Sequence, residues 1–117
     1  MKLKLMIVLL LISVCNTLFA VEMDKIAAYP VPFNPKKHQR IIIGEPSVVL
    51  AGYNIKIEIF DINGDLVTKR TGSQFPVYWN GRNDSGRYVK PGMYIIKVVA
   101  ENDNEYGRKT IRILVNY

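Results

Sequence analysis

Two short polar segments contain the residues whose types and spacing come nearest to a chemical site: residues 61–65 (DINGD) and residues 83–86 (NDSG). Their oxygen atoms are ligands that calcium accepts, but calcium takes about six to eight oxygens and usually a bidentate carboxylate. The closing glutamate of an EF-hand loop is missing from both segments. Such side chains also bond local backbone N–H groups, so we interpret both segments as turns and expect no metal or other cofactor.

Catalytic chemistry has little support in the sequence. His38 is the only histidine and lies in the basic stretch 36–40 (KKHQR), where we interpret it as a solvent-exposed loop residue. A hydrolase acting through Asp61 or Asp84 would need a base or nucleophile beside the carboxylate, and none is evident. We therefore predict that the chain is not an enzyme, has no catalytic residues and has no small-molecule substrate.

The formal charge is +6 at pH 7, but the basic residues are dispersed along the chain. The densest basic stretch contains no aromatic residue, whereas nucleic-acid binding requires a clustered basic patch. We therefore expect no nucleic-acid partner.

The N-terminal segment has the order of a secretory signal peptide. Lys2 and Lys4 precede an apolar run over residues 5–14, and Ala20 supplies a small residue for cleavage. The run is too short to cross about 30 Å of hydrocarbon as a helix, although an uncleaved anchor is an alternative. We expect an exported protein, in the periplasm, at the cell surface or outside the cell, with membrane contact only through this helix.

Cys15 is the only cysteine in the sequence. A lipid-modified Cys15 is the alternative to simple cleavage, although Val14 stands where such sites usually have a small residue. Cleavage after Ala20 would remove the cysteine, so the exported protein would have no disulfide even in an oxidising compartment.

The sequence after the predicted signal peptide predicts an all-β protein, because short β-branched and aromatic runs recur between Gly, Pro, Asn and Asp residues. The strong strands span 54–60, 66–70, 93–101 and 109–115, and weaker ones lie near 25–29, 40–43, 48–50 and 75–79. About seven strands with frequent turns indicate an immunoglobulin-like antiparallel β-sandwich preceded by the signal-peptide helix, and a small barrel is the alternative.

Alternation within the strong strands predicts which residues are buried. Ile55, Ile57 and Ile59 alternate with polar or larger neighbours, so we expect them on one inner face. Residues 94, 96, 98 and 100 should share the inner face of the strand over 93–101. Asn63-Gly64 between two strands predicts a hairpin, because both residues tolerate positive φ.

The segment 29–35 (YPVPFNP) contains three prolines. Proline cannot donate a ladder hydrogen bond, so we expect an extended edge segment with Tyr29 and Phe33 tucked beneath the sandwich. A proline-rich ligand for an aromatic groove is the alternative. The predicted domains are a signal peptide (1–20), a proline-rich lead-in with the first edge strand (21–38) and the sandwich (39–117), with 25–35 packed on it.

The segment 79–94 is rich in turn-forming residues. Asn80, Asn83, Asp84 and Ser85 can each bond local backbone, and three glycines can supply positive φ. A buried Trp79 would need a partner for its indole N–H.

Together these segments resemble the immunoglobulin-like domain of the flagellar hook-capping protein FlgD and the C-terminal sorting domains of type IX secretion. Val31 replaces an asparagine of the sorting-domain motif, and Asn80 stands where aspartate is frequent. The residues that carry the resemblance are Tyr29, Pro30, Pro32, Phe33, Asn34, Pro35, Asp61, Gly64, Trp79, Asn80, Gly81, Asp84, Gly86, Gly92 and Tyr94.

The resemblance implies a sandwich of about seven strands in which the motif residues are structural. Function does not transfer with the fold, because one sandwich supports many roles. An exported sandwich without catalytic residues, whose strand edges can accept a partner strand, predicts a non-enzymatic interaction module with a protein partner in a larger envelope or flagellum-related assembly. The alternative is a minimal type IX secretion substrate or an orphan sorting domain.

Overall fold

The computed structural model describes residues 23–117. The predicted signal peptide and its helix, the cleavage position and Cys15 lie outside the described residues. Between residues 23 and 117, no helix is long and apolar enough to cross a membrane.

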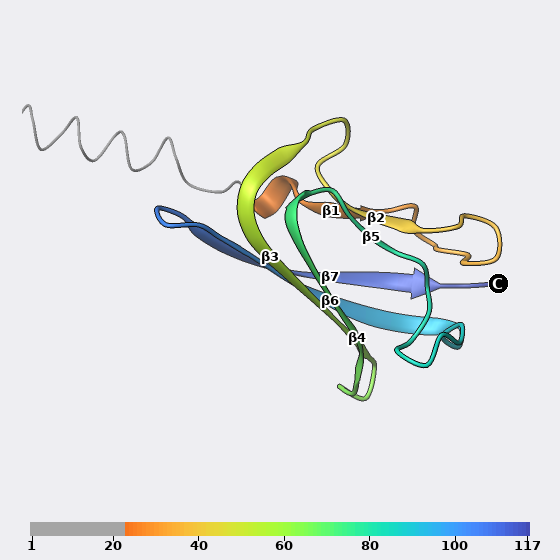
Figure 1. Ribbon diagram of the computed structural model, residues 1–117. Coiled ribbons are helices and arrows are strands. Elements are labelled where there is room, and N and C mark those ends of the chain that lie inside the picture. Colours follow the sequence, from red (N-terminus) through yellow and green to blue (C-terminus); the bar gives the residue numbers. More distant parts are fainter. Residues whose placement is uncertain (1–22) are drawn as a thin grey trace, which may run out of the picture.

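The described chain folds into two antiparallel sheets packed face to face (Figure 1). A short 3₁₀ turn, η1 (Met23–Lys25), precedes the strands β1 (Ala27–Tyr29), β2 (Ile41–Gly44), β3 (Leu50–Asp61), β4 (Leu66–Phe75), β5 (Val77–Trp79), β6 (Gly92–Glu101) and β7 (Tyr106–Val115). The strand order is β1-β2-β5 in the smaller sheet and β4-β3-β6-β7 in the larger one. The predicted immunoglobulin-like sandwich of seven strands is confirmed.

The larger sheet follows the predicted alternation. Ile55, Ile57 and Ile59 are buried at 2% exposure or less, and the residues at 94, 96, 98 and 100 are also buried. Because β3 and β6 are the two inner strands of this sheet, their inner faces form the middle of the core. Ile41 and Ile43 of β2 face them from the smaller sheet at 0% exposure.

The predicted strand near 48–50 does not form a separate element. Leu50 is the first residue of β3 and pairs with Phe75 at the end of β4. A register shift between Ala51 and Ile55, with Gly52 at φ +86°, then bends the long strand. The two strands therefore extend further than the sequence indicated.

A single strand over 75–79 was also the wrong interpretation. Phe75 ends β4 in the larger sheet, and Val77 begins β5, where it pairs with Ile43 of the smaller sheet. Pro76 lies between them and has no N–H to donate, so the ladder stops there. The chain passes from one sheet to the other at this proline.

The hairpin at residues 61–65 forms, but by a different turn from the one expected. Gly64 has φ +87°, whereas Asn63 is not among the residues with positive φ. The Asp61 carboxylate oxygen Oδ1 accepts the N–H groups of Asn63 (2.9 Å) and Asp65 (3.0 Å). The N–H of Gly64 donates to the carbonyl of Asp61 (3.0 Å), and that of Asp61 donates to the carbonyl of Asp65 (3.0 Å).

The same four hydrogen bonds recur at residues 83–87. Asn83 Oδ1 accepts the N–H groups of Ser85 and Arg87, both at 3.0 Å. The N–H of Gly86 donates to the carbonyl of Asn83 (3.0 Å), and that of Asn83 donates to the carbonyl of Arg87 (2.9 Å). The amide oxygen of Asn83 therefore accepts the same two backbone hydrogen bonds as the carboxylate oxygen of Asp61.

This equivalence makes a prediction for Asp61. Asp61→Asn keeps the accepting oxygen and should leave the free energy of unfolding nearly unchanged, whereas Asp61→Ala should lower it by about 1 kcal/mol. Urea unfolding followed by the fluorescence of Trp79, the one tryptophan, measures both. Equal losses in the two variants, or a calcium-dependent rise in the wild-type midpoint, would contradict the turn interpretation.

Candidate functional site

Three buried aromatic side chains join the proline-rich segment to the turn-rich segment. The ring centroids of Phe33 and Trp79 are 6.1 Å apart, and those of Trp79 and Tyr94 are 6.2 Å apart. Their exposures are 0%, 1% and 6% for Phe33, Trp79 and Tyr94. Tilted rings at this spacing stabilise one another beyond the burial of their surface. We call Phe33, Trp79 and Tyr94 the aromatic row.

The proline-rich segment connects the two sheets. Tyr29 pairs with Ile42 in the smaller sheet. Four residues later, the N–H of Phe33 donates to the carbonyl of Leu114 (2.8 Å), and its carbonyl accepts the N–H of Asn116 (3.0 Å). Pro30 and Pro32 lie between these two anchors and cannot donate to either sheet.

The N-terminal turn is also fastened to β7. The ammonium of Lys109 donates to the carbonyls of Asp24 (2.8 Å) and Ile26 (2.6 Å). Neither contact had any signal in the sequence, because each joins residues more than 80 positions apart. The segment 24–33 is therefore attached to β7 at both of its ends.

His38 does not lie free in solvent, and the solvated-loop interpretation was wrong. Its Nδ1 accepts the N–H of Asn34 (3.0 Å), and its ring stacks on Phe33 with centroids 6.2 Å apart. Asn34 Oδ1 accepts the N–H of Lys36 (3.0 Å), and Pro35 is buried. The five residues from Asn34 form a compact turn that covers one side of Phe33.

Gly81 is the point where the turn-rich segment meets the proline-rich one. A Cβ atom placed on Gly81 would lie 2.6 Å from Pro35 Cβ and 3.1 Å from Phe33 Cε2. Gly81 also has φ +78°, which L side chains rarely adopt. Only glycine therefore allows the two segments to approach so closely.

The turns around Gly81 satisfy the polar groups that the sequence singled out. The indole N–H of Trp79 donates to the carbonyl of Arg82 (2.9 Å), which supplies the partner it needs. Asn80 Oδ1 accepts the N–H of Arg82 (3.1 Å), as expected of a turn residue. Gly86 and Gly92 have φ +78° and +153°.

Asp84 bonds across the molecule rather than locally. Its Oδ1 accepts the hydroxyl of Thr68 (2.7 Å), which in turn accepts a hydrogen bond from Arg70 (3.0 Å). Thr68 is fully buried, so this partner satisfies a polar group that would otherwise destabilise the core. Sequence spacing gave no signal for this contact between β4 and the loop.

Asp61 and Asp84 line one groove of about 550 Å³, together with Tyr88 and Tyr94, whereas His38 does not line it. Asp61 Oδ1 holds two backbone N–H groups and Asp84 Oδ1 holds the Thr68 hydroxyl. Among residues 23–117, no three His, Cys, Asp or Glu side chains gather as a metal-binding group. The arrangement gives both carboxylates a structural role.

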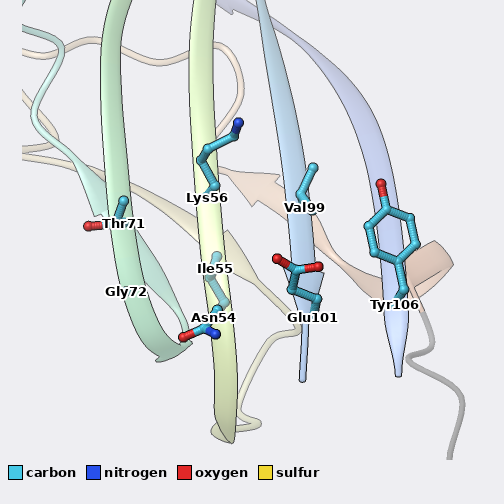
Figure 2. A pocket seen from close by; sticks show the side chains of 8 residues that line it. All are labelled: Asn54, Ile55, Lys56, Thr71, Gly72, Val99, Glu101 and Tyr106. Atoms are coloured by element: carbon cyan, nitrogen blue, oxygen red, sulfur yellow. The ribbon is translucent and has the colours of Figure 1, made fainter. Parts of the chain in front are cut away.

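A second hollow, of about 570 Å³, lies on the larger sheet at the end away from this groove. Figure 2 shows that its lining comes from four neighbouring strands, β4, β3, β6 and β7. Its lining includes the oppositely charged residues Lys56 and Glu101, and the ion partner of Lys56 is Glu58, at 3.6 Å. None of the motif residues lines this hollow, and the sequence did not indicate it.

Comparison with known proteins finds structural likeness but no sequence-family match. No family model and no curated protein matches the chain. Part of PorZ, an essential bacterial surface component of the type IX secretion system of Porphyromonas gingivalis, superimposes with a TM-score of 0.59 and 26% identity over 82% of this chain. Part of dimeric latent PorU from the same organism superimposes with a TM-score of 0.51 and 16% identity over 78%.

The chain corresponds to only 12% of the PorZ chain and 9% of the PorU chain. The PorU likeness shows the fold alone. Together they support an immunoglobulin-like fold related to components of type IX secretion, in agreement with the resemblance of the motifs to sorting domains. They do not specifically support the resemblance to the flagellar hook-capping protein.

A comparison with Gly86 separates the effect of the close contact at Gly81 from the effect of its positive φ. Gly81 and Gly86 share φ +78°, but a Cβ on Gly86 would meet nothing within 4 Å. Gly81→Ala should therefore lower the free energy of unfolding by roughly 1–3 kcal/mol more than Gly86→Ala, because only the former clashes with Pro35. Urea unfolding of the pair measures the difference, and equal losses would show that the close approach is unimportant.

The environment of the Tyr94 hydroxyl predicts that the folded protein loses stability at alkaline pH. Its hydroxyl donates to the carbonyl of Lys90 (2.6 Å), and burial, followed by the charges of Asp61 and Tyr117, raises its pKa. The unfolded chain then loses the phenolic proton at lower pH than the folded one, so stability falls as pH rises above about 10.

Tyr94→Phe should cost about 1 kcal/mol at pH 7, because the hydrogen bond to Lys90 is lost. It should also make the free energy of unfolding fall less steeply between about pH 9 and 12. Urea unfolding across this range tests both effects. A fall as steep as that of the wild type would assign it to other groups, such as Tyr53, whose pKa is raised by burial and by Glu105.

Proposed function

We propose that this chain is a non-enzymatic immunoglobulin-like module that docks on a protein assembly of the bacterial cell surface related to type IX secretion. The likeness to part of PorZ, at 26% identity over 82% of the chain, is the observation that carries the proposal. PorZ is a surface component of that system, and the predicted signal peptide supports export of this chain to the same side of the inner membrane.

The chemistry of the described residues supports a binding role rather than catalysis. The carboxylates of Asp61 and Asp84 hold turn and core groups in place, and His38 packs on Phe33 away from both of them. A hydrolase needs a base and a nucleophile in one pocket. The proposal therefore assigns the chain to protein recognition, with a rigid sandwich as the scaffold.

A minimal secretion substrate or orphan sorting domain is the second candidate. The motif segments 29–35 and 79–94, which resemble those of sorting domains, favour it. The two candidates differ in where the protein finishes: a docking module stays with its assembly at the cell surface, whereas a substrate is released or carries a passenger outward. A flagellum-related assembly is supported by the sequence resemblance alone.

Cell fractionation of the tagged full chain separates the candidates. An epitope inserted between Asp103 and Asn104, two exposed residues of the turn between β6 and β7, leaves the aromatic row untouched. Docking predicts surface-exposed protein with a discrete crosslinked protein partner. Sorting predicts that a passenger inserted after residue 22 reaches the medium. Protein retained in the cytoplasm would contradict both candidates.

A further inference from the structure

The outer face of the larger sheet and the adjoining β3–β4 turn expose apolar side chains at one end. Ile62, Leu66, Met93 and Leu114 are 72%, 48%, 41% and 37% exposed. Pairing register places Leu66, Met93 and Leu114 around half-buried Phe60 and Ile95, because Phe60 lies opposite Leu66 and Ile95, and Met93 lies opposite Leu114. Ile62, in the turn after β3, lines the same hollow as Met93 and Ile95. We call these six residues, Phe60, Ile62, Leu66, Met93, Ile95 and Leu114, the apolar platform.

The platform contains a hollow of about 280 Å³ lined by Ile62, Met93, Tyr94, Ile95 and Arg112. Its walls are mainly apolar, and Arg112 is the one charged residue among them. A recess of this kind on an exposed apolar patch is where a buried anchor side chain contributes most to an interface. Exposed apolar patches rimmed by polar groups are typical of interaction surfaces.

Basic side chains border the platform. Arg112 pairs with Ile95 across β7 and β6, and the Lys97 ammonium lies 5.0 Å from the ring centroid of Phe60. Register adds Lys69, opposite Glu58 on the neighbouring strand. We call Lys69, Lys97 and Arg112 the basic rim.

The acidic groups nearby are already engaged or lie to one side. Glu58 faces Lys69 and Lys97 in the sheet and pairs with Lys56 at 3.6 Å. Asp61 and Asp65 lie in the turn that closes one end of the platform, and Asp61 Oδ1 holds two backbone N–H groups. Arg112 ends the row that carries Phe60 and Ile95, and the next row carries Lys69 and Lys97 with Glu58 between them. These two rows therefore present three positive charges and one negative charge beside the hollow.

We propose that the apolar platform binds an acidic segment of a protein partner, with an apolar side chain in the hollow and carboxylates on Lys97 and Arg112. Charge complementarity selects this occupant, since opposite potentials across an interface favour association and exclude wrong partners. A second copy of this chain would oppose its own basic rim. The inference deepens the proposed function by naming the docking face and the chemistry of the partner.

Site-specific photocrosslinking in the producing cells tests the face. A photoreactive phenylalanine derivative replaces Ile62, beside the hollow, or Tyr78, which is 41% exposed on the smaller sheet. The full chain is used, and crosslinked peptides are sequenced by mass spectrometry. Lys97→Glu with Arg112→Glu reverses the rim, while Lys56→Glu with Arg108→Glu makes the same change of charge at the other end of this face.

The expected result is one protein adduct from position 62, crosslinked at a segment rich in Asp and Glu. Its yield should fall roughly tenfold or more in the rim-reversed variant and persist in the matched variant. Urea unfolding of both variants confirms that each is folded.

Other outcomes overturn the inference in distinguishable ways. Adducts from position 78 but none from position 62 would move docking to another face and leave the proposed function standing, whereas no protein adduct at either position would contradict both. A dimer of the chain, or an adduct equal in both charge variants, would exclude the acidic partner. Rim-dependent flotation with phosphatidylglycerol vesicles, without a protein adduct, would assign the face to a membrane.

Discussion

The packing of Gly81 against Pro35 and Phe33 is the constraint on which the rest of the molecule depends. This contact brings the proline-rich segment under the turn-rich loop and closes one end of the core over Trp79. The backbone of Phe33 then bonds to β7, so the same few residues belong to both layers. A side chain at position 81 would have to displace a proline ring or an aromatic ring, neither of which is flexible.

The features that could be predicted from the sequence are those that depend on neighbouring residues. Alternation is a property of neighbouring residues, which is why the buried faces of β3 and β6 could be assigned before the structure. The features that could not be predicted depend on pairing between residues far apart in the chain. The run 75–79 has strand composition throughout, and only its two different partners, Leu50 and Ile43, reveal that Pro76 divides it between sheets. The bond from Thr68 to Asp84 joins residues 16 positions apart, and the stacking of His38 on Phe33 depends on how the loop folds back, so neither was visible in the sequence pattern.

Turn chemistry and metal chemistry use the same atoms, and the structure shows how the two can be separated. The oxygens of Asp61 and Asn83 each accept N–H groups two and four residues onward. Asn102 repeats part of this pattern, accepting N–H groups from Asn104 and Glu105. An oxygen directed at its own backbone is turned away from a shared ligand, so the recurrence of asparagine and aspartate before glycine reflects hairpin geometry.

The two hydrogen bonds from Lys109 define how mechanical load would enter the domain. Tension applied at Met23 meets first the core packing of Met23 and Ile26 together with the ammonium bonds to Asp24 and Ile26, then the three-residue pairing of β1, and afterwards the bonds of Phe33 to β7. These attachments lie in series along the chain, so the first can yield while the aromatic row stays closed. Load on the leading end is therefore passed to β7 of the larger sheet at two separate places, through the side chain of Lys109 and through the backbone beside Phe33.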